Sequence, residues 1–581
     1  MDCGLKTLLR EKAWALHHGT REDRRRIQDK VRKEIDARKR KYRERLEHLF
    51  STNDSRGAWE GLQKISGYKP GKTKMIVENE EIFSEDLNKF YARFDSTDFS
   101  AEIQRELSLL GNENVCPEIT STVVRKYFKK VKARKASGPD SLEGRLLREC
   151  ADQLAPIFAT IFQRSLDTST IPSIWKKSVI IPLPKKPRPS SMNDYRPVAL
   201  TSLTMKVFEQ IILKHLLHDT AQYADPHQFA YRQRRSTEDA VLLLQHQVLS
   251  HLDSQGTSAR ILFVDFSSAF NTIQPHKMIE KLKNMEANTY IIRWICNFLT
   301  NRTQCVRLGS HLSSTVTTNT GAPQGCVISP ALFSLYTADC KPIPSSSSDA
   351  LLKYADDKAL IGLITKDDDT AFIQEVNNLV SWCDENFLHL NPKKTKEMQI
   401  DFRRNPKTPA PLVIKGEKIE IVTSYKYLGI TLENSLKWTE NTLAVQKKAS
   451  QRLYFLRKLK KFRVDKTILQ LFYKSVIQST LTYGLTCTIG NITEKDKKKL
   501  NKIIKSAGRV IGEQPQKIEE LGADAVITKA LSVLDDPTHP LRAHFIRAQS
   551  GVRYLSIKTK TSRLKDSFLP MSVRLLNNCA R

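Results

Sequence analysis

The 581-residue sequence has ten cysteines but no Cys-x-x-Cys pair, which argues against a structural zinc site and a disulfide framework. We expect reduced, mostly buried thiols. No stretch approaches the roughly 18 apolar residues of a membrane span, and the first residues lack the apolar core of a signal peptide. Acidic residues are few beside basic ones: 63 Asp and Glu against 94 Lys and Arg give a net charge of +31. We therefore expect an intracellular protein of the nucleus or cytoplasm, not secreted and without a membrane partner, that binds a polyanion such as nucleic acid.

Basic residues are concentrated near the start of the chain. Residues 21–45 contain thirteen Lys or Arg and six Asp or Glu, with Ile27, Val31 and Ile35 spaced four apart, which predicts a long basic helix. This pattern fits a solvated helix face and a nucleic-acid contact equally well. Residues 51–75 resemble a linker in composition.

The remainder of the chain mixes two periodicities. Between about 116 and 435, β-rich runs such as 178–183, 261–264 and 305–308 alternate with helical patterns, which indicates an α+β fold. From Asn441 onward, apolar positions follow helical spacing among many Lys and Arg. There is no internal repeat of 20 to 50 residues.

Two apolar runs end in carboxylates. Residues 261–264 lead into Asp265, and residues 351–355 lead into Asp356 and Asp357, which should occupy the turn of a β-hairpin. A buried carboxylate without a cation or donor costs several kcal/mol, and a bound metal ion removes that cost. Hard cations such as Mg²⁺ take carboxylate and phosphate oxygens, and two of them can serve phosphoryl transfer. The sequence therefore predicts a two-ion site bridged by Asp265 and Asp356.

A loop pattern lies between the two acidic runs. Residues 321–330 are rich in Gly and Pro and lead into an apolar helical stretch. Alone, this pattern is an ordinary loop before a helix. Combined with the acids, it indicates one functional site.

Further segments complete an order that is typical of one family. They are Gly138–Asp140, Ile181–Lys185, Tyr195–Leu200, Gln228–Arg232, Val264–Asn271, Gly321–Pro330, Tyr354–Asp357, Leu390–Lys396 and Tyr427–Gly429. With them the chain resembles the reverse transcriptases of non-LTR retrotransposons (LINEs), most closely the jockey-like branch, over residues 116 to 435.

The resemblance implies an α+β right-hand polymerase fold with fingers, palm and thumb. We expect a basic helical N-terminal extension and linker at 1–75, an N-terminal extension and fingers at 76–255, the palm at 256–435, and a thumb with a C-terminal helical region at 436–581. The implied partners are an RNA template, a DNA primer and dNTPs. Members of this branch usually carry an endonuclease, for which residues 1–75 are too short and too polar, so we expect nicking to come from a protein in trans.

The resemblance also assigns roles to individual residues. Its catalytic residues are Asp265, Asp356 and Asp357; its metal site comprises Asp265, Phe266, Asp356 and Asp357 with two Mg²⁺ ions, or Mn²⁺ as a substitute. Its nucleotide-binding residues are Lys185 and Arg196 at the triphosphate, Phe270 beneath the sugar, Gln324 at the nucleotide and template, and Lys394 near the leaving pyrophosphate. Its primer grip is Tyr427, Leu428 and Gly429.

Three positions depart from the family pattern without removing a presumed metal ligand. Asn271 stands where Asp is common, Ala230 where Gly is common and Lys358 where Thr is common. The expected function is RNA-directed DNA polymerisation. The alternatives are a domesticated, non-catalytic nucleic-acid-binding protein, which has no use for three clustered acids, and a reverse transcriptase like the maturases of group II introns, which shares the acids.

Overall fold

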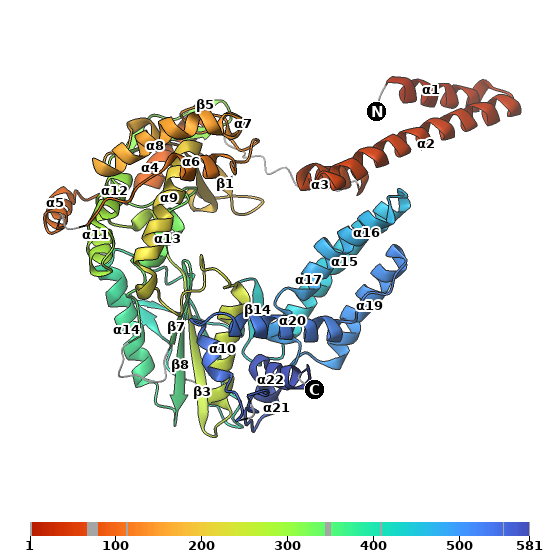
Figure 1. Ribbon diagram of the computed structural model, residues 1–581. Helices are drawn as coiled ribbons and strands as arrows, with labels where there is room; N and C mark the ends of the chain where they lie inside the picture. Colours follow the sequence, from red (N-terminus) through yellow and green to blue (C-terminus); the bar gives the residue numbers. More distant parts are fainter. Residues whose placement is uncertain are drawn as a thin grey trace. The chain divides into compact units, whose positions relative to one another are not determined.

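The computed structural model describes residues 3–66, 79–111, 114–342, 350–406, 409–549 and 551–579 (Figure 1). The chain divides into two compact units. The helical unit comprises 1–72 and 437–529, and the sheet unit comprises 73–436 and 530–581. Each unit therefore combines two segments that are apart in sequence, whereas the sequence predicted four consecutive regions. Part of the expected linker, 67–75, lies outside the described residues.

A five-stranded sheet carries the predicted acids, and we call it the carboxylate sheet. Its strand order is β12 (Glu420–Ile421), β9 (Lys396–Ile400), β3 (Thr257–Val264), β8 (Asp357–Thr365) and β7 (Ala350–Tyr354). β7 and β8 form an antiparallel hairpin in which Tyr354 pairs with Asp357, so the predicted hairpin with acids at its turn is confirmed. Helices α10 (Thr237–Leu252) and α14 (Thr370–Glu385) pack on its two faces (Figure 1).

A second sheet lies in the same unit. It consists of β1 (Lys177–Pro184), β2 (Tyr195–Leu200), β4 (Arg302–Leu308), β5 (His311–Leu312) and β6 (Val316–Thr318). β1 runs antiparallel to β2 and parallel to β4. Two hairpins flank β12 along the chain: β10 (Val413–Ile414) with β11 (Glu417–Lys418) before it, and β13 (Ser424–Tyr427) with β14 (Ile430–Glu433) after it.

Helices surround both sheets and share one large apolar core. They are α5 (Ser100–Ser108), α6 (Ser121–Phe128), α7 (Gly144–Glu149), α8 (Ala151–Asp167), α9 (Leu203–Asp219), α11 (Pro275–Asn284), α12 (Thr289–Leu299) and α13 (Ser329–Tyr336). Helix α4 (Glu80–Ala92) packs instead in a smaller apolar cluster with Ile180, Tyr195 and Val306 of the second sheet. The C-terminal helices α21 (Ser562–Lys565) and α22 (Phe568–Cys579) pack on α10.

Polar contacts fasten the C-terminal segment beside α10. Arg235 forms a buried ion pair with Asp536, with 2.7 Å between Nε and Oδ2. Asp239 and His539, both 1% exposed, approach to 3.3 Å. The segment after residue 530 therefore belongs to the sheet unit.

The helical unit joins the N-terminal helices to a later helical region. Its helices are α1 (Cys3–His18), α2 (Arg21–Ser51), α3 (Ser55–Ser66), α15 (Thr439–Lys461), α16 (Lys466–Phe472), the π-helix η5 (Tyr473–Gln478), α17 (Ser479–Thr482), α18 (Leu485–Thr488) and α19 (Glu494–Ile511), followed by α20 (Ile518–Leu534), whose last residues belong to the sheet unit. The predicted basic helix is confirmed as α2, which starts at a capping box of Thr20 and Asp23. Trp59 of α3 packs on Phe455 of α15, with ring centroids 5.5 Å apart.

The helices and cysteines of the described residues bear on two features of the composition. None of the helices that the structure describes has both the length and the apolarity to cross a membrane. The nine cysteines with described side chains are free thiols, and five of them are buried.

Candidate active site

A cleft of about 660 Å³ in the sheet unit gathers most of the predicted site residues. Its walls come from the end of α4, from β2, from the residues just after β1 and β3, and from the loops around residues 265–271, 323–326, 356 and 391–394. The predicted residues that line it are Lys185, Arg196, Asp265, Phe266, Phe270, Gln324, Asp356 and Lys394. One cleft therefore contains carboxylates, cations and an aromatic ring from segments far apart in sequence.

Asp265 is held at the end of β3 by the segment after residue 389. Its backbone N–H donates to Thr395 Oγ1 at 3.3 Å, and its carbonyl accepts from Asn391 N at 2.9 Å. Its side-chain Oδ2 is buried without a hydrogen-bond partner, and the nearest cation, Lys394 Nζ, lies 3.8 Å away. This orphaned oxygen is a fitting ligand for a cation.

The three acids influence one another. Burial raises the pKa of Asp265, and the charge of Asp356 raises it further. The Asp357 residue is exposed overall. Partial burial of its carboxyl group and the charges of Asp356 and Asp265 nevertheless raise the pKa of this carboxyl to about 6. Asp357 does not line the cleft itself. Mutual repulsion of this kind is relieved by a bound cation.

The acids do not form a closed metal site by themselves. Among the described residues, no three His, Cys, Asp or Glu side chains converge as a ready set of metal ligands. Asp265 and Asp356 instead border an open cleft. An ion bound there needs further ligands, and Mg²⁺ sites commonly take them from substrate phosphates and water.

Three predicted cations, Lys185, Arg196 and Lys394, line the cleft. Lys185 Nζ donates to Asn193 O at 2.7 Å, and burial together with the charges of Lys394 and Arg196 lowers the pKa of Lys185. Arg196 is exposed on β2, in register with Leu183 on β1. The cations are therefore close enough to repel one another, as expected where a polyanion binds.

The predicted loop before α13 is confirmed, and glycines explain its path. Gly321 has φ +80°, and a Cβ there would lie 2.7 Å from the Asn271 backbone; Gly325 has φ +135°. The loop carbonyl of Gln324 accepts from Ala199 N at 2.7 Å. Only glycine permits this close approach, which places Gln324 in the cleft.

Phe270 and the predicted primer grip differ in placement. Phe270 lines the cleft and stacks on Phe333, with centroids 4.9 Å apart. Tyr427 is 2% exposed and packs on Phe263 behind the cleft, so its ring is a core residue. Leu428 and Gly429, both with positive φ, form the β13–β14 turn and do not line the cleft.

Two buried charged residues beside the site were not predicted as site residues from the sequence. Lys358 is 1% exposed, with its ammonium 4.8 Å from the ring centroids of both Phe266 and Trp382. Glu209 of α9 is fully buried and accepts from the N–H groups of Val327 and Ile328, before α13. A lysine next to an apolar run was the one sequence signal that could have indicated the burial of Lys358. Nothing in the sequence indicates the burial of Glu209.

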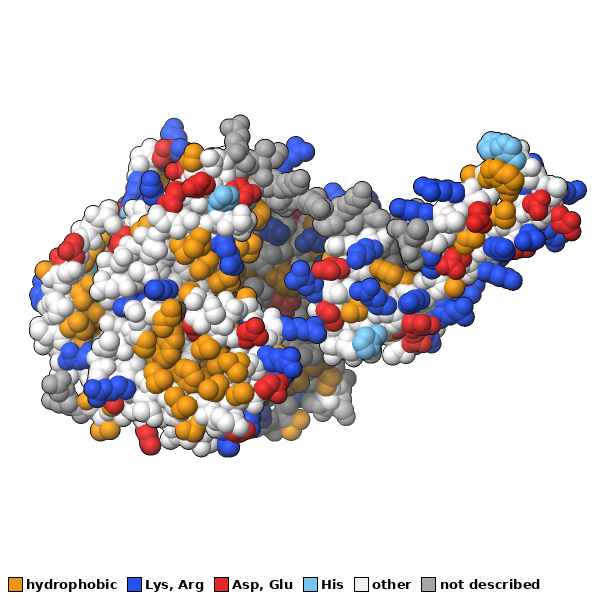
Figure 2. Space-filling model, turned by 90° about the horizontal axis from the view of Figure 1, so that it is seen from above, with side chains coloured by type: hydrophobic (Ala, Val, Ile, Leu, Met, Phe, Trp, Pro, Cys, Tyr) orange, Lys and Arg blue, Asp and Glu red, His pale blue; other side chains and the backbone are white. Residues whose placement is uncertain are grey.

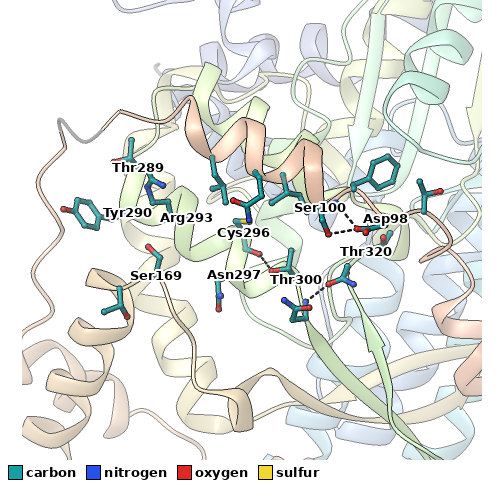
Figure 3. Close-up of a pocket in the computed structure, with 18 of the residues that line it drawn as sticks. Asp98, Ser100, Ser169, Thr289, Tyr290, Arg293, Cys296, Asn297, Thr300 and Thr320 are labelled. Carbon is teal, nitrogen blue, oxygen red and sulfur yellow. Dashed lines mark hydrogen bonds between the residues drawn. The ribbon is translucent and has the colours of Figure 1, made fainter.

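A second, larger cavity of about 890 Å³ contains none of the predicted site residues (Figure 3). Its polar groups bond to one another: Asp98 accepts from Ser100, Thr300 Oγ1 donates to the Cys296 carbonyl, and Asn301 N donates to Asn319. Cavity size alone therefore does not identify the site.

The part of the chain that forms the first cleft matches a known family. Residues 183–432, less than half of the chain, match a family model described as reverse transcriptase (RNA-dependent DNA polymerase). A second model, described as the N-terminal region of alkylated DNA repair protein alkB homolog 8, matches residues 438–479.

Individual relatives are similar over a longer stretch. The chain is 28% identical over 341 residues to the probable RNA-directed DNA polymerase from transposon BS of Drosophila melanogaster, covering 57% of this chain and 37% of the relative. It is 26% identical over 385 residues to the RNA-directed DNA polymerase from mobile element jockey of the same species, covering 63% and 41%. The resemblance to jockey-like reverse transcriptases is thus confirmed. The chain spans about two fifths of the length of these curated relatives.

Proposed function

We propose that this chain is an RNA-directed DNA polymerase. In the reaction, a primer 3′-hydroxyl attacks the α-phosphate of a dNTP opposite an RNA template, and pyrophosphate leaves. The observation that carries the proposal is the single cleft in which Asp265 and Asp356 stand with Lys185 and Arg196, within the residues that match the reverse transcriptase model. Cationic side chains can bind the phosphates of such a substrate, and carboxylates can bind the metal ions that accompany it.

Asp265, Asp356 and Asp357, beside Phe266, would hold two Mg²⁺ ions, with Mn²⁺ as a substitute. Such ions, when bound, neutralise charge on the attacking and leaving oxygens of a phosphoryl transfer. The orphaned Oδ2 of Asp265 and the raised pKa values of Asp265 and Asp357 support this assignment.

The cations would hold the triphosphate. The planar guanidinium of Arg196 suits bidentate phosphate binding, and Lys185 acts as a point charge. Lys394, on the same cleft wall as Asp265, would donate a proton to the leaving pyrophosphate. Gln324 would contact the nucleotide and the template strand.

The hairpin turn at Tyr427, Leu428 and Gly429 would support the primer end. In this role Tyr427 acts through packing, because its ring is buried against Phe263. The exposed backbone of the turn at Gly429 is the part able to meet the primer.

Primer extension on a homopolymer RNA template with the purified chain tests the proposal. Asp265→Asn and Asp356→Asn should each lower Mg²⁺-dependent cDNA synthesis by several orders of magnitude and leave RNA binding largely intact, because the carboxylates act mainly on the transition state. Glu417→Gln, an acid-to-amide change on the exposed β10–β11 hairpin, should behave as wild type.

Two outcomes would contradict the proposal in different ways. Equal activity in the Asp265→Asn or Asp356→Asn variant removes the two-ion assignment. Absence of synthesis by the wild type, with RNA binding retained, favours a non-catalytic nucleic-acid-binding protein.

A further inference from the structure

Arg93, just after α4, packs against two aromatic rings. Its guanidinium carbon lies 3.8 Å from the Phe90 ring centroid and 4.2 Å from that of Phe94. Nη1 donates to the Phe90 carbonyl at 2.5 Å, and Nη2 donates to Ser268 Oγ at 3.2 Å. The arginine therefore has a fixed orientation, with one edge directed at Ser268.

Ser268 lies in the cleft wall in a backbone conformation that is unfavourable for a non-glycine residue. It lies between Asp265 and Phe270, lines the cleft and has a left-handed backbone with φ +59°. Non-glycine residues persist in this conformation only when their surroundings hold them there. The hydrogen bond from Arg93 is one such support.

Phe94, the residue after Arg93, supports the same loop through a second contact. The Phe94 ring stacks on His389, with centroids 5.4 Å apart. The His389 carbonyl accepts from Ser267 N at 2.8 Å. Two contacts from one short segment thus fix the loop between Asp265 and Phe270. One runs from Arg93 to Ser268, and the other runs from Phe94 through His389 to Ser267.

We propose that Arg93 is a positioning residue that holds the Ser268–Phe270 wall, and through it sets the affinity and the sugar selection for the incoming nucleotide. This inference rests on the proposed polymerase function. Arg93 acts through Ser268 and not on substrate, because two rings pack against its guanidinium group and the residue does not line the cleft. A displacement of about 1 Å in such a wall can change a rate about 100-fold.

The experiment measures KM and kcat for a dNTP on a preformed RNA–DNA primer-template, with the ratio of dNTP to rNTP incorporation efficiency. Arg93→Ala should raise the KM for dNTP by roughly tenfold, change kcat less, and lower the dNTP to rNTP ratio. Arg93→Lys keeps the charge without the planar stack and should be intermediate. Lys89→Ala, which changes an exposed cation near the end of α4, is the matched control and should equal wild type.

Ser268→Ala tests the route of the effect. It should shift KM and the sugar ratio in the same direction as Arg93→Ala, and the double variant should be no worse than Arg93→Ala alone. Ser268→Ala also keeps the test decisive if Arg93→Ala does not fold.

Three results separate the possible failures. Unchanged KM and sugar ratio in Arg93→Ala, even with a lower melting temperature, would leave Arg93 a purely structural residue and overturn the inference. Additive effects in the double variant would also overturn it, since Arg93 would then act independently of Ser268. Absence of incorporation by the wild type would overturn the proposed function and this inference with it.

Discussion

Phe270 shows how one side chain can serve both packing and specificity. One part of its ring lines the cleft, and another part stacks on the fully buried Phe333. The residue is half-buried, so it belongs neither wholly to the core nor wholly to the site. A ring fixed by the core at the cleft wall is suited to exclude a 2′-hydroxyl.

Phe270→Ala should therefore raise ribonucleotide incorporation markedly while some dNTP synthesis remains. Its cost in stability should stay below the roughly 3 to 5 kcal/mol of a fully buried phenylalanine. The measurement is the rNTP to dNTP ratio of incorporation efficiency, beside a melting curve. Phe372→Leu, in the same core but outside the cleft, should lower the melting temperature without altering the ratio. An unchanged ratio in Phe270→Ala would dismiss it as the sugar gate.

Glu209 predicts a pH effect on the loop before α13. Burial raises the pKa of this carboxyl from 4.5 to about 7. The folded state therefore binds the proton more tightly than the unfolded chain does, so this contribution to stability is complete below pH 4.5 and is lost as pH rises through 7.

Glu209→Gln should remove that dependence because the amide oxygen still accepts a hydrogen bond but does not titrate. Between pH 5 and pH 8, the melting temperature of the wild type should fall by a few degrees relative to the variant, since the shift corresponds to about 3 kcal/mol at most. Parallel melting curves of the two proteins across this range would refute the raised pKa.

At the scale of elements, the loop of residues 321–325 depends on backbone approach more than on side chains. The Ala322 N–H donates to the Phe270 carbonyl at 2.8 Å, so this loop and the Ser268–Phe270 wall support each other. A Cβ on Gly321 would lie 2.7 Å from the Asn271 backbone, which cannot move without shifting Phe270.

Gly321→Ala should accordingly lower polymerase activity at least tenfold and destabilise the protein by a few kcal/mol, from positive φ and overpacking together. Gly416→Ala is the matched control: its φ is +79°, but nothing lies within 4 Å of the added Cβ. It should cost about 1 kcal/mol and leave activity unchanged. Equal effects of the two changes on activity would show that the close approach at Gly321 is unimportant.

Elements defined by local pattern were predictable from sequence. The apolar runs before Asp265 and Asp356 became β3 and β7, because side-chain alternation and a tight turn fix a hairpin within a few residues. The basic helix α2 followed from the four-residue spacing of Ile27, Val31 and Ile35, which is also a local pattern.

Contacts between distant segments were not predictable. Arg93 meets Ser268 across 175 residues, and Arg235 meets Asp536 across 301. No periodicity encodes such pairs, because they arise only when whole helices and loops pack together. The burial of Tyr427 behind the sheet likewise depends on its neighbour Phe263 and not on its own motif.

At the scale of the whole molecule, charge is divided unevenly between the two units. The helical unit contains 40 Lys or Arg and 19 Asp or Glu, so it carries +21 of the net +31 in 165 of the 581 residues. The sheet unit has 54 Lys or Arg and 44 Asp or Glu, a net charge of +10. Lys and Arg side chains stand along the visible face of the N-terminal helices (Figure 2). Electrostatic attraction to nucleic acid should therefore come mainly from the helical unit.

Neutralising one face of α2 tests this expectation. The substitutions Arg26→Gln, Lys30→Gln, Lys33→Gln and Arg40→Gln change four exposed cations at helical spacing. Each phosphate contact contributes roughly −0.7 to −0.9 to the slope of log K against log salt, so the fourfold variant should make this slope shallower by roughly 3 if all four meet phosphates. The measurement is RNA-binding affinity from about 50 to 200 mM salt.

A matched variant makes the comparison specific to the helical unit. Lys126→Gln, Lys130→Gln, Arg145→Gln and Lys214→Gln remove the same charge from exposed positions of the sheet unit outside the cleft. This variant should change the slope of log K against log salt much less, because only cations that contact phosphates contribute to it. An equal change in both variants would mean that binding follows total charge, and no change in the α2 variant would mean that this face is solvated and not at the interface.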